Sequence, residues 1–241
     1  MIAARRDGGE GKSSNRPGRQ VVDAARWTER IADELGLGEL ALLGTSGGGP
    51  HAAAAAAGLG DRVRRLCLVA GLGPDEMPGF DPAAGMVAET RQEIACARAG
   101  ETPLRVFIDE LMKRPDPLDD WLSQLPPSDV EILGRGEVRL EDQAIQSEAM
   151  RQGPEGWIED DLALFHRPWG FQLSDVTAET LLLYGFEDVL VPANHGDAYV
   201  MELGHGQLVK IPDAGHWMRD YESDVLNWLV SPAQGPARII G

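Results

Sequence analysis

The 241-residue chain has few cysteines and few aromatic side chains, and it lacks a long apolar run. Its two cysteines, Cys67 and Cys96, cannot build a disulfide framework, and Cys67 lies in an apolar run that predicts a buried small hydrophobe. No apolar stretch approaches the roughly 20 residues that a membrane-spanning helix needs. The first residues lack the apolar core of a signal peptide. We therefore expect no membrane partner and a cytoplasmic location.

Basic residues are also scarce relative to acidic ones. The chain has 22 Lys and Arg residues against 39 Asp and Glu residues, which gives a formal net charge of −17. Such a chain repels phosphate backbones, so we expect no nucleic-acid partner. With 43% hydrophobic residues, the chain is long enough to bury one core and to carry a small extra module.

The chain alternates short apolar runs with helical patterns. Buried strands are predicted at residues 40–43, 65–70, 180–184 and 207–211. Helices are predicted at residues 21–35, 50–58, 194–203 and 217–230. Strands that alternate with helices in this way indicate an α/β fold, in which a doubly wound, mostly parallel sheet is covered on both faces.

One long segment interrupts this alternation. From Pro74 to about Leu173 the apolar residues follow helical spacing, and no strong strand pattern occurs. The sequence therefore predicts an α/β core made of residues 1–73 and 173–241, with an inserted helical cap at residues 74–172. Ligands of such sheets bind beyond the carboxyl ends of the strands.

A G-x-S-x-G motif follows the first of these strands. It spans Gly44 to Gly48, a predicted helix follows it, and Ser46 is its central residue. This context is typical of a nucleophile on a strained turn between strand and helix, with its hydroxyl exposed above the sheet. The backbone N–H of Gly47, at the amino end of the helix, is the candidate oxyanion donor.

A serine nucleophile needs a base, and the base needs an orienting acid. Asp188 follows the predicted strand at 180–184, and His216 follows the next strand, at 207–211. All three side chains are then expected at one edge of the sheet, in the chain order Ser, Asp, His. Glu187 is the alternative to Asp188 as the orienting acid.

Three stretches resemble the α/β-hydrolase fold family, in particular its small capped hydrolases. They are LGTSGGGP at 43–50, LYGFEDVLVP at 183–192 and IPDAGH at 211–216. The resemblance spans nearly the whole chain and is loosest in the helical block. It implies that this block is the cap, and that residues 156–161 and 168–171 form the return segment into the core.

The resemblance also implies a departure at the N-terminus. The family sheet has about eight strands, and residues 5–13 resemble the glycine-rich loop after the fourth. On this interpretation the first three strands are absent, together with the loop that supplies the second oxyanion donor. The loss of the third strand is expected to open the middle of the sheet, and an open edge invites pairing with a second copy of the chain. Loss of one oxyanion donor costs about 10²–10³ in rate.

Four further residues are weaker candidates for substrate contact. Trp157 and Trp169 are candidate pocket walls, Asp160 a candidate partner for a substrate ammonium group, and His166 a candidate contact from the cap. The competing interpretation is packing for the tryptophans and a solvated face for the aspartate. No cluster has metal-ligand spacing and no phosphate-binding lysine loop is present, so we expect neither a metal nor a cofactor.

The predicted function is hydrolysis of a small-molecule ester, amide or peptide through an acyl-enzyme. Two alternatives remain. One is an aminopeptidase of the proline-iminopeptidase type, in which acidic cap residues hold the substrate amino group. The other is a non-catalytic or truncated hydrolase-like protein. The resemblance disfavours a dehalogenase or an epoxide hydrolase, because those members carry aspartate at the position of Ser46.

Overall fold

Five parallel strands form one sheet in the described part of the chain. The computed structural model describes residues 2–4, 15–75, 77–114 and 121–231. The strands are β1 (Ile2–Ala4), β2 (Leu40–Thr45), β3 (Val63–Val69), β4 (Glu179–Gly185) and β5 (Gln207–Ile211). Their spatial order is the order of the chain, β1 to β5, and every neighbouring pair is parallel. The four strands predicted after residue 39 are all present.

The strand pairing differs from the expectation at one place. A gap was predicted beside residues 40–43, where the resemblance puts a third family strand. Instead β1 pairs directly with β2, with Ile2 opposite Leu42 and Ala4 opposite Gly44. The predicted opening in the middle of the sheet is therefore wrong, because the segment before the predicted glycine-rich loop occupies that place. The loop itself, at residues 5–13, lies outside the described residues.

Helices pack against both sides of this sheet. They are α1 (Asp23–Glu34), α2 (Gly48–Leu59), α9 (Asn194–Leu203) and α10 (Glu222–Val230). Short 3₁₀ turns are η1 (Gly60–Arg62), η2 (Met150–Gln152), η3 (Leu173–Asp175) and η4 (Arg219–Tyr221). Helix α10 packs on β2 and β3, whereas α1, α2, η3 and α9 contact one another in series. This arrangement is the predicted doubly wound sheet.

The last helix begins later than its predicted start at residue 217. Residues 217 and 218 are irregular, the 3₁₀ turn η4 follows them, and the backbone N–H groups of His216 and Trp217 donate to the side chain of Asp129. The regular helix starts at Glu222, and Val225, Trp228 and Leu229 form its buried face.

Small side chains let α2 approach the sheet closely. Ala52 to Ala56 are all buried in the main core, together with the strand residues they cover. Cys67 on β3 is fully buried, as predicted, and burial raises the pKa of its thiol. It therefore packs as a small apolar side chain and is not a reactive thiol.

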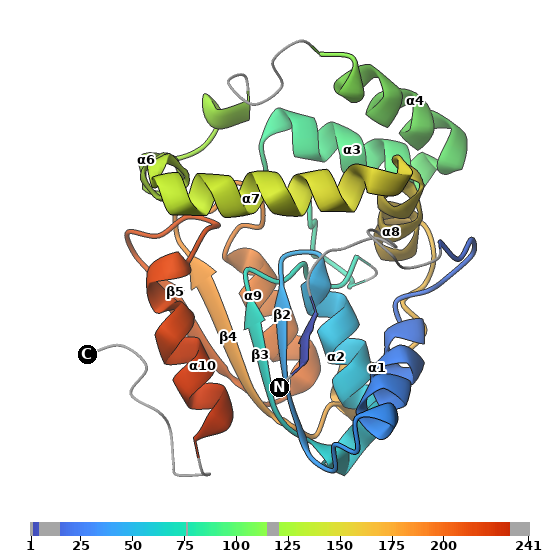
Figure 1. The fold of residues 1–241 in the computed structure, drawn as a ribbon, viewed down its shortest axis with the longest axis vertical. Coiled ribbons are helices and arrows are strands. Elements are labelled where there is room, and N and C mark those ends of the chain that lie inside the picture. The colour runs from blue at the N-terminus through green and yellow to red at the C-terminus, as the bar shows by residue number, and fades with distance from the viewer. Residues whose placement is uncertain (1, 5–14, 76, 115–120, 232–241) are drawn as a thin grey trace.

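A group of helices lies between β3 and β4 in the chain, and we call it the helical insertion. It comprises α3 (Ala88–Ala99), α4 (Glu101–Met112), α6 (Pro127–Gly134), α7 (Gly136–Ala149) and α8 (Glu155–Phe165). Figure 1 shows these helices gathered beyond the carboxyl ends of the strands, where the arrowheads point. Ligands of parallel α/β sheets bind at this edge.

Candidate active site

Ser46 occupies a strained turn between β2 and α2. Its φ is +53°, and among the described non-glycine residues only Ala70 shares a positive φ. The turn is held from both sides: the N–H of Ser46 donates to the Val69 carbonyl at 3.0 Å, and its carbonyl accepts N–H bonds from Gly49 at 2.9 Å and Leu72 at 3.1 Å. Backbone strain of this kind persists only where the surroundings impose it.

Two glycines make room for this turn. A Cβ on Gly44 would lie 2.7 Å from Cβ of Ala52 and 2.8 Å from the Gly48 carbonyl oxygen. A Cβ on Gly49 would lie 2.8 Å from Cα of Gly71. The first glycine of the motif is therefore required by close packing of strand and helix. The role of Gly49, just beyond the motif, was missed.

Gly47 lies directly after the serine and caps the amino end of α2. The amides at this end of a helix have no acceptor within the helix, and the helix dipole favours negative charge there. The position suits an oxyanion donor, and this role for Gly47 stays a prediction.

His216 and Asp188 are joined by a short hydrogen bond. Nδ1 of His216 lies 2.8 Å from Oδ2 of Asp188, and both side chains follow adjacent paired strands, β5 and β4. Asp188 is buried, and its Oδ1 accepts the N–H groups of Leu190 and Val191, each at 2.8 Å. With Nδ1 donating to the carboxylate, the neutral ring leaves Nε2 free of hydrogen and able to accept a proton.

The alternative acid makes a different contact. The carboxylate of Glu187 accepts a hydrogen bond from Oγ of Ser128 at 2.7 Å. Of these two acids, Asp188 is therefore the one that contacts the ring of His216. Their separation in the chain is 28 residues, and the strand-end positions identified the pair because parallel strands end at one edge.

Asp129 is a buried carboxylate of this region that sequence reasoning missed. It lies on α6, is fully buried, and accepts the N–H groups of His216 at 3.0 Å and Trp217 at 2.9 Å. Burial raises the pKa of Asp129, although the two N–H bonds act in the opposite direction. No motif surrounds it, so no local signal could have identified it.

His195 is a second buried group without a sequence signal. Its Nδ1 accepts the N–H of Gly73 at 2.8 Å, so the proton lies on Nε2, which donates to the Pro82 carbonyl at 2.9 Å. Burial lowers the pKa of His195 to about 4, and the bond to Pro82 opposes that shift. This neutral imidazole joins α9 to the segment that leads into the helical insertion.

Asp160 is engaged in an internal charge cluster. It is buried on α8, and its Oδ1 accepts Nη1 of Arg19 at 2.8 Å and lies 3.1 Å from Nε2 of His51. A second pair follows from the neighbouring residue of α8, because Glu159 accepts a hydrogen bond from Arg167 at 2.9 Å. The predicted alternative of a solvated acidic face is wrong for Asp160, because this carboxylate is enclosed and paired.

The other substrate-contact candidates lie on and after α8. The indole N–H of Trp157 donates to Glu93 at 2.7 Å, and the exposed His166 places Nδ1 3.1 Å from the Arg98 carbonyl. Trp169 donates its indole N–H to the Leu164 carbonyl at 3.0 Å and stacks on Phe171 with ring centroids 6.1 Å apart. Substrate contact by any of them stays a prediction.

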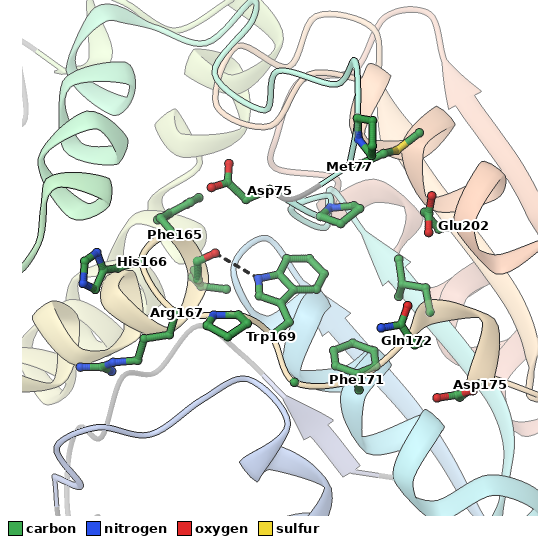
Figure 2. Close-up of a pocket in the computed structure, with 16 residues that line it drawn as sticks. Asp75, Met77, Phe165, His166, Arg167, Trp169, Phe171, Gln172, Asp175 and Glu202 are labelled. Atoms are coloured by element: carbon green, nitrogen blue, oxygen red, sulfur yellow. Dashed lines mark hydrogen bonds between the residues drawn. The ribbon is translucent and has the colours of Figure 1, made fainter.

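Trp169 and His166 line one cavity of about 540 Å³, which Figure 2 shows in close-up. Its wall is formed by the segment around Pro74, the end of α8, residues 168–173, Asp175 and Glu202. None of Ser46, Asp188 and His216 belongs to that lining. The cavity is therefore separate from the candidate triad.

Within the described residues, no group of three or more His, Cys, Asp and Glu side chains is arranged to hold a metal ion. No helix in the described part of the chain has the length and apolar character needed to cross a membrane.

A family model described as alpha/beta hydrolase fold matches residues 8–222. The chain belongs to this family. It is 26% identical over 207 residues to the 2-hydroxy-6-oxononadienedioate/2-hydroxy-6-oxononatrienedioate hydrolase of Escherichia coli O139:H28. That match covers 86% of this chain and 66% of the relative, so the chain spans just under two thirds of the curated relative's length.

Solved structures share this α/β-hydrolase fold. A thermophilic esterase from Thermogutta terrifontis superposes with a TM-score of 0.61 at 24% identity, covering 92% of this chain and 76% of the esterase. A bromoperoxidase from Bacillus anthracis gives a TM-score of 0.63 at 20% identity, covering 93% and 80%. At these identities the likeness establishes the fold, and function must be argued from the site.

Proposed function

We propose that this α/β-hydrolase chain is a serine hydrolase that cleaves a small ester, amide or peptide through an acyl-enzyme. The observation that carries the proposal is the short His216–Asp188 bond at the same sheet edge as the strained Ser46 turn. Serine activation requires a base that is oriented by an acid, at the same sheet edge as a serine on a turn between strand and helix.

The proposed reaction has two stages. Oγ of Ser46 attacks the substrate carbonyl carbon while Nε2 of His216 takes the hydroxyl proton. The N–H of Gly47 donates to the oxyanion. The bond to the leaving group then breaks, and His216 gives its proton to that group. In the second stage His216 takes a proton from water, the hydroxide attacks the acyl carbon, and the acid leaves as Ser46 regains its proton.

Asp188 has a positioning and electrostatic part in both stages. It holds Nδ1–H of His216, which keeps Nε2 available, and it stabilises the imidazolium that forms. Its own orientation is fixed by the N–H groups of Leu190 and Val191.

We also propose that the helical insertion, within residues 74–172, acts as a cap over the triad and that the substrate is a small molecule. The position of the insertion beyond the carboxyl ends of the strands supports this part. The net charge of −17 argues against a nucleic-acid partner. For the location of the enzyme we propose the cytoplasm.

The aminopeptidase alternative needs a carboxylate for the substrate ammonium group. Asp160, the residue named for that role, already pairs with Arg19 at 2.8 Å and is enclosed. The geometry therefore favours an ester or a neutral acyl substrate.

The decisive experiment is covalent labelling of the purified chain with a fluorophosphonate, followed by peptide mapping. We expect the label on Ser46, and its loss in Ser46→Ala and His216→Ala. Ser223→Ala, at an exposed serine of α10, is the matched control and should label normally. Turnover is then screened with short-chain esters, proline arylamides and the dioic-acid substrate class named for the Escherichia coli relative. A folded chain that takes no label at Ser46 would overturn the proposal.

A further inference from the structure

The first turn of α6 reaches down to both loops that carry the proposed base and acid. Both carboxylate oxygens of Asp129 are used: Oδ2 accepts the N–H of His216 at 3.0 Å and Oδ1 accepts the N–H of Trp217 at 2.9 Å. Asp129 is fully buried, so no solvent competes for these bonds. A buried carboxylate is costly unless donors satisfy it, and here the donors are the main chain of the base itself.

The glycine before His216 leaves the space that the Asp129 carboxylate occupies. A Cβ on Gly215 would overlap the carboxylate of Asp129. Gly215 is the residue directly before His216 in the IPDAGH stretch. Its lack of a side chain is therefore what lets a helix of the insertion bond to the backbone of the base.

The preceding residue of α6 contacts the acid loop. Oγ of Ser128 donates to Glu187, which is the residue before Asp188, at 2.7 Å. The N–H of Glu187 in turn donates to the Ala214 carbonyl at 2.9 Å, so the two loops are also joined to each other.

Apolar packing fixes α6 in this place. A small cluster of buried residues in and around α6 and α7 packs on side chains that directly follow the acid and the base: Leu125, Ile132, Leu133 and Val138 with Val189, Leu190 and Trp217. Trp217 also lies edge-on to the His216 ring, with centroids 5.1 Å apart. The insertion thus holds the acid and base loops by polar and apolar contacts together.

We infer that Asp129 is a positioning residue for His216, so that α6 of the insertion sets the geometry of the base as well as covering the site. The inference rests on the proposed function. The bond from Nδ1 to Asp188 fixes the imidazole ring, and the two bonds that Asp129 accepts fix the main chain of His216 and Trp217. Without them the ring can rotate and shift while its bond to Asp188 survives. Misplacement by about 1 Å costs on the order of 10² in rate.

The test compares Asp129→Asn and Asp129→Ala with Glu131→Gln. Asparagine keeps the size of the side chain, but its NH₂ group meets one of the two N–H donors, so one bond is lost. Alanine removes both. Glu131 lies on the same helix, is exposed and contacts Arg135 at 3.4 Å, so Glu131→Gln removes one charge from α6 without touching the base loop.

The expected result is a split between kcat and KM. With an ester substrate, Asp129→Asn should lower kcat and the fluorophosphonate labelling rate of Ser46 together, by about 10-fold to 100-fold, with KM within about twofold of wild type. Glu131→Gln should match wild type in all three quantities. Amide hydrogen exchange at His216 and Trp217 should be faster in Asp129→Asn. Because asparagine conserves volume, this variant keeps the test valid if Asp129→Ala fails to fold.

Two failures are distinguishable. If wild type labels at Ser46 and Asp129→Asn labels and turns over equally fast, this inference is overturned and the proposed function stands. If the folded wild-type chain neither labels nor turns over any acyl substrate, the proposed function is overturned and this inference falls with it. Equal losses of kcat in Asp129→Asn and Glu131→Gln would also overturn the inference, because a general charge effect would explain both.

Discussion

The buried His195 is expected to make the stability of this fold fall as the pH is lowered. Its pKa is about 4 in the folded chain and 6.5 for an ordinary histidine, because burial disfavours the charged ring. Between these two values the unfolded chain binds a proton that the folded chain does not. The free energy of unfolding therefore decreases as the pH falls through this range, and above about pH 6.5 the effect vanishes.

The size of the effect follows from the same two values. Between pH 7.5 and pH 5.0, protonation of His195 in the unfolded chain alone lowers the free energy of unfolding by about 2 kcal/mol. A typical domain has about 5–15 kcal/mol in total, so this loss is readily measurable. At pH 5.0 an ordinary carboxyl group is still mostly ionised, and the contributions of the other titrating groups are shared by wild type and a variant of His195 alone.

The assay is urea unfolding at pH 7.5 and 5.0, compared between wild type and His195→Gln. Glutamine has an N–H donor for the Pro82 carbonyl but does not titrate. Between pH 7.5 and 5.0, the free energy of unfolding of His195→Gln should therefore fall by about 2 kcal/mol less than that of wild type. His166→Gln, at an exposed histidine, is the matched control and should behave as wild type. Equal pH-dependent losses in wild type and His195→Gln would refute the reasoning.

Three further substitutions test the site and its support. Asp188→Asn should lower kcat by about 10³–10⁴ while the fold persists, because the imidazole loses its orienting acid; steady-state kinetics that match wild type would exclude Asp188 from the triad. Gly44→Ala should lower the free energy of unfolding by about 1–3 kcal/mol, since its Cβ would meet three atoms of α2 at 2.7–2.9 Å, whereas Gly38→Ala, which meets nothing within 4 Å, should cost far less. Tyr184→Phe should cost about 1–3 kcal/mol in the same urea assay, because the Gly71 carbonyl loses its 2.6 Å bond to the phenol; an unchanged midpoint would mean that this carbonyl finds another donor.

The elements predicted from sequence were those with a strong local pattern. The strands after residue 39 and the helix at 194–203 are present. They could be predicted because a short apolar run indicates a buried strand, and apolar residues at helical spacing indicate a helix with one buried face. The start of α10 was predicted too early, because apolar spacing does not separate the irregular residues 217–218 and the 3₁₀ turn η4 from the regular helix that begins at Glu222. The pairing of β1 with β2 was missed, since it depends on which strands become neighbours and not on their composition.

The candidate triad could be proposed from sequence for a geometric reason. Parallel strands place their carboxyl ends at one edge, so Ser46, Asp188 and His216 were expected together from strand positions alone. The His216–Asp188 bond at 2.8 Å agrees with that expectation. The catalytic roles of the three residues stay predictions until Ser46 is labelled.

Sequence by itself determined the positions of the strands after residue 39, the turn at Ser46 and the sheet edge at which Ser46, Asp188 and His216 were expected, because these follow from local periodicity and from the glycines of the motif. Tertiary structure alone decided that Asp188 and not Glu187 contacts the ring of His216, that Asp160 pairs with Arg19, and that Asp129 accepts the backbone N–H of His216. These outcomes join residues up to 141 positions apart. They depend on the path of loops and on burial, which no local pattern of side chains encodes.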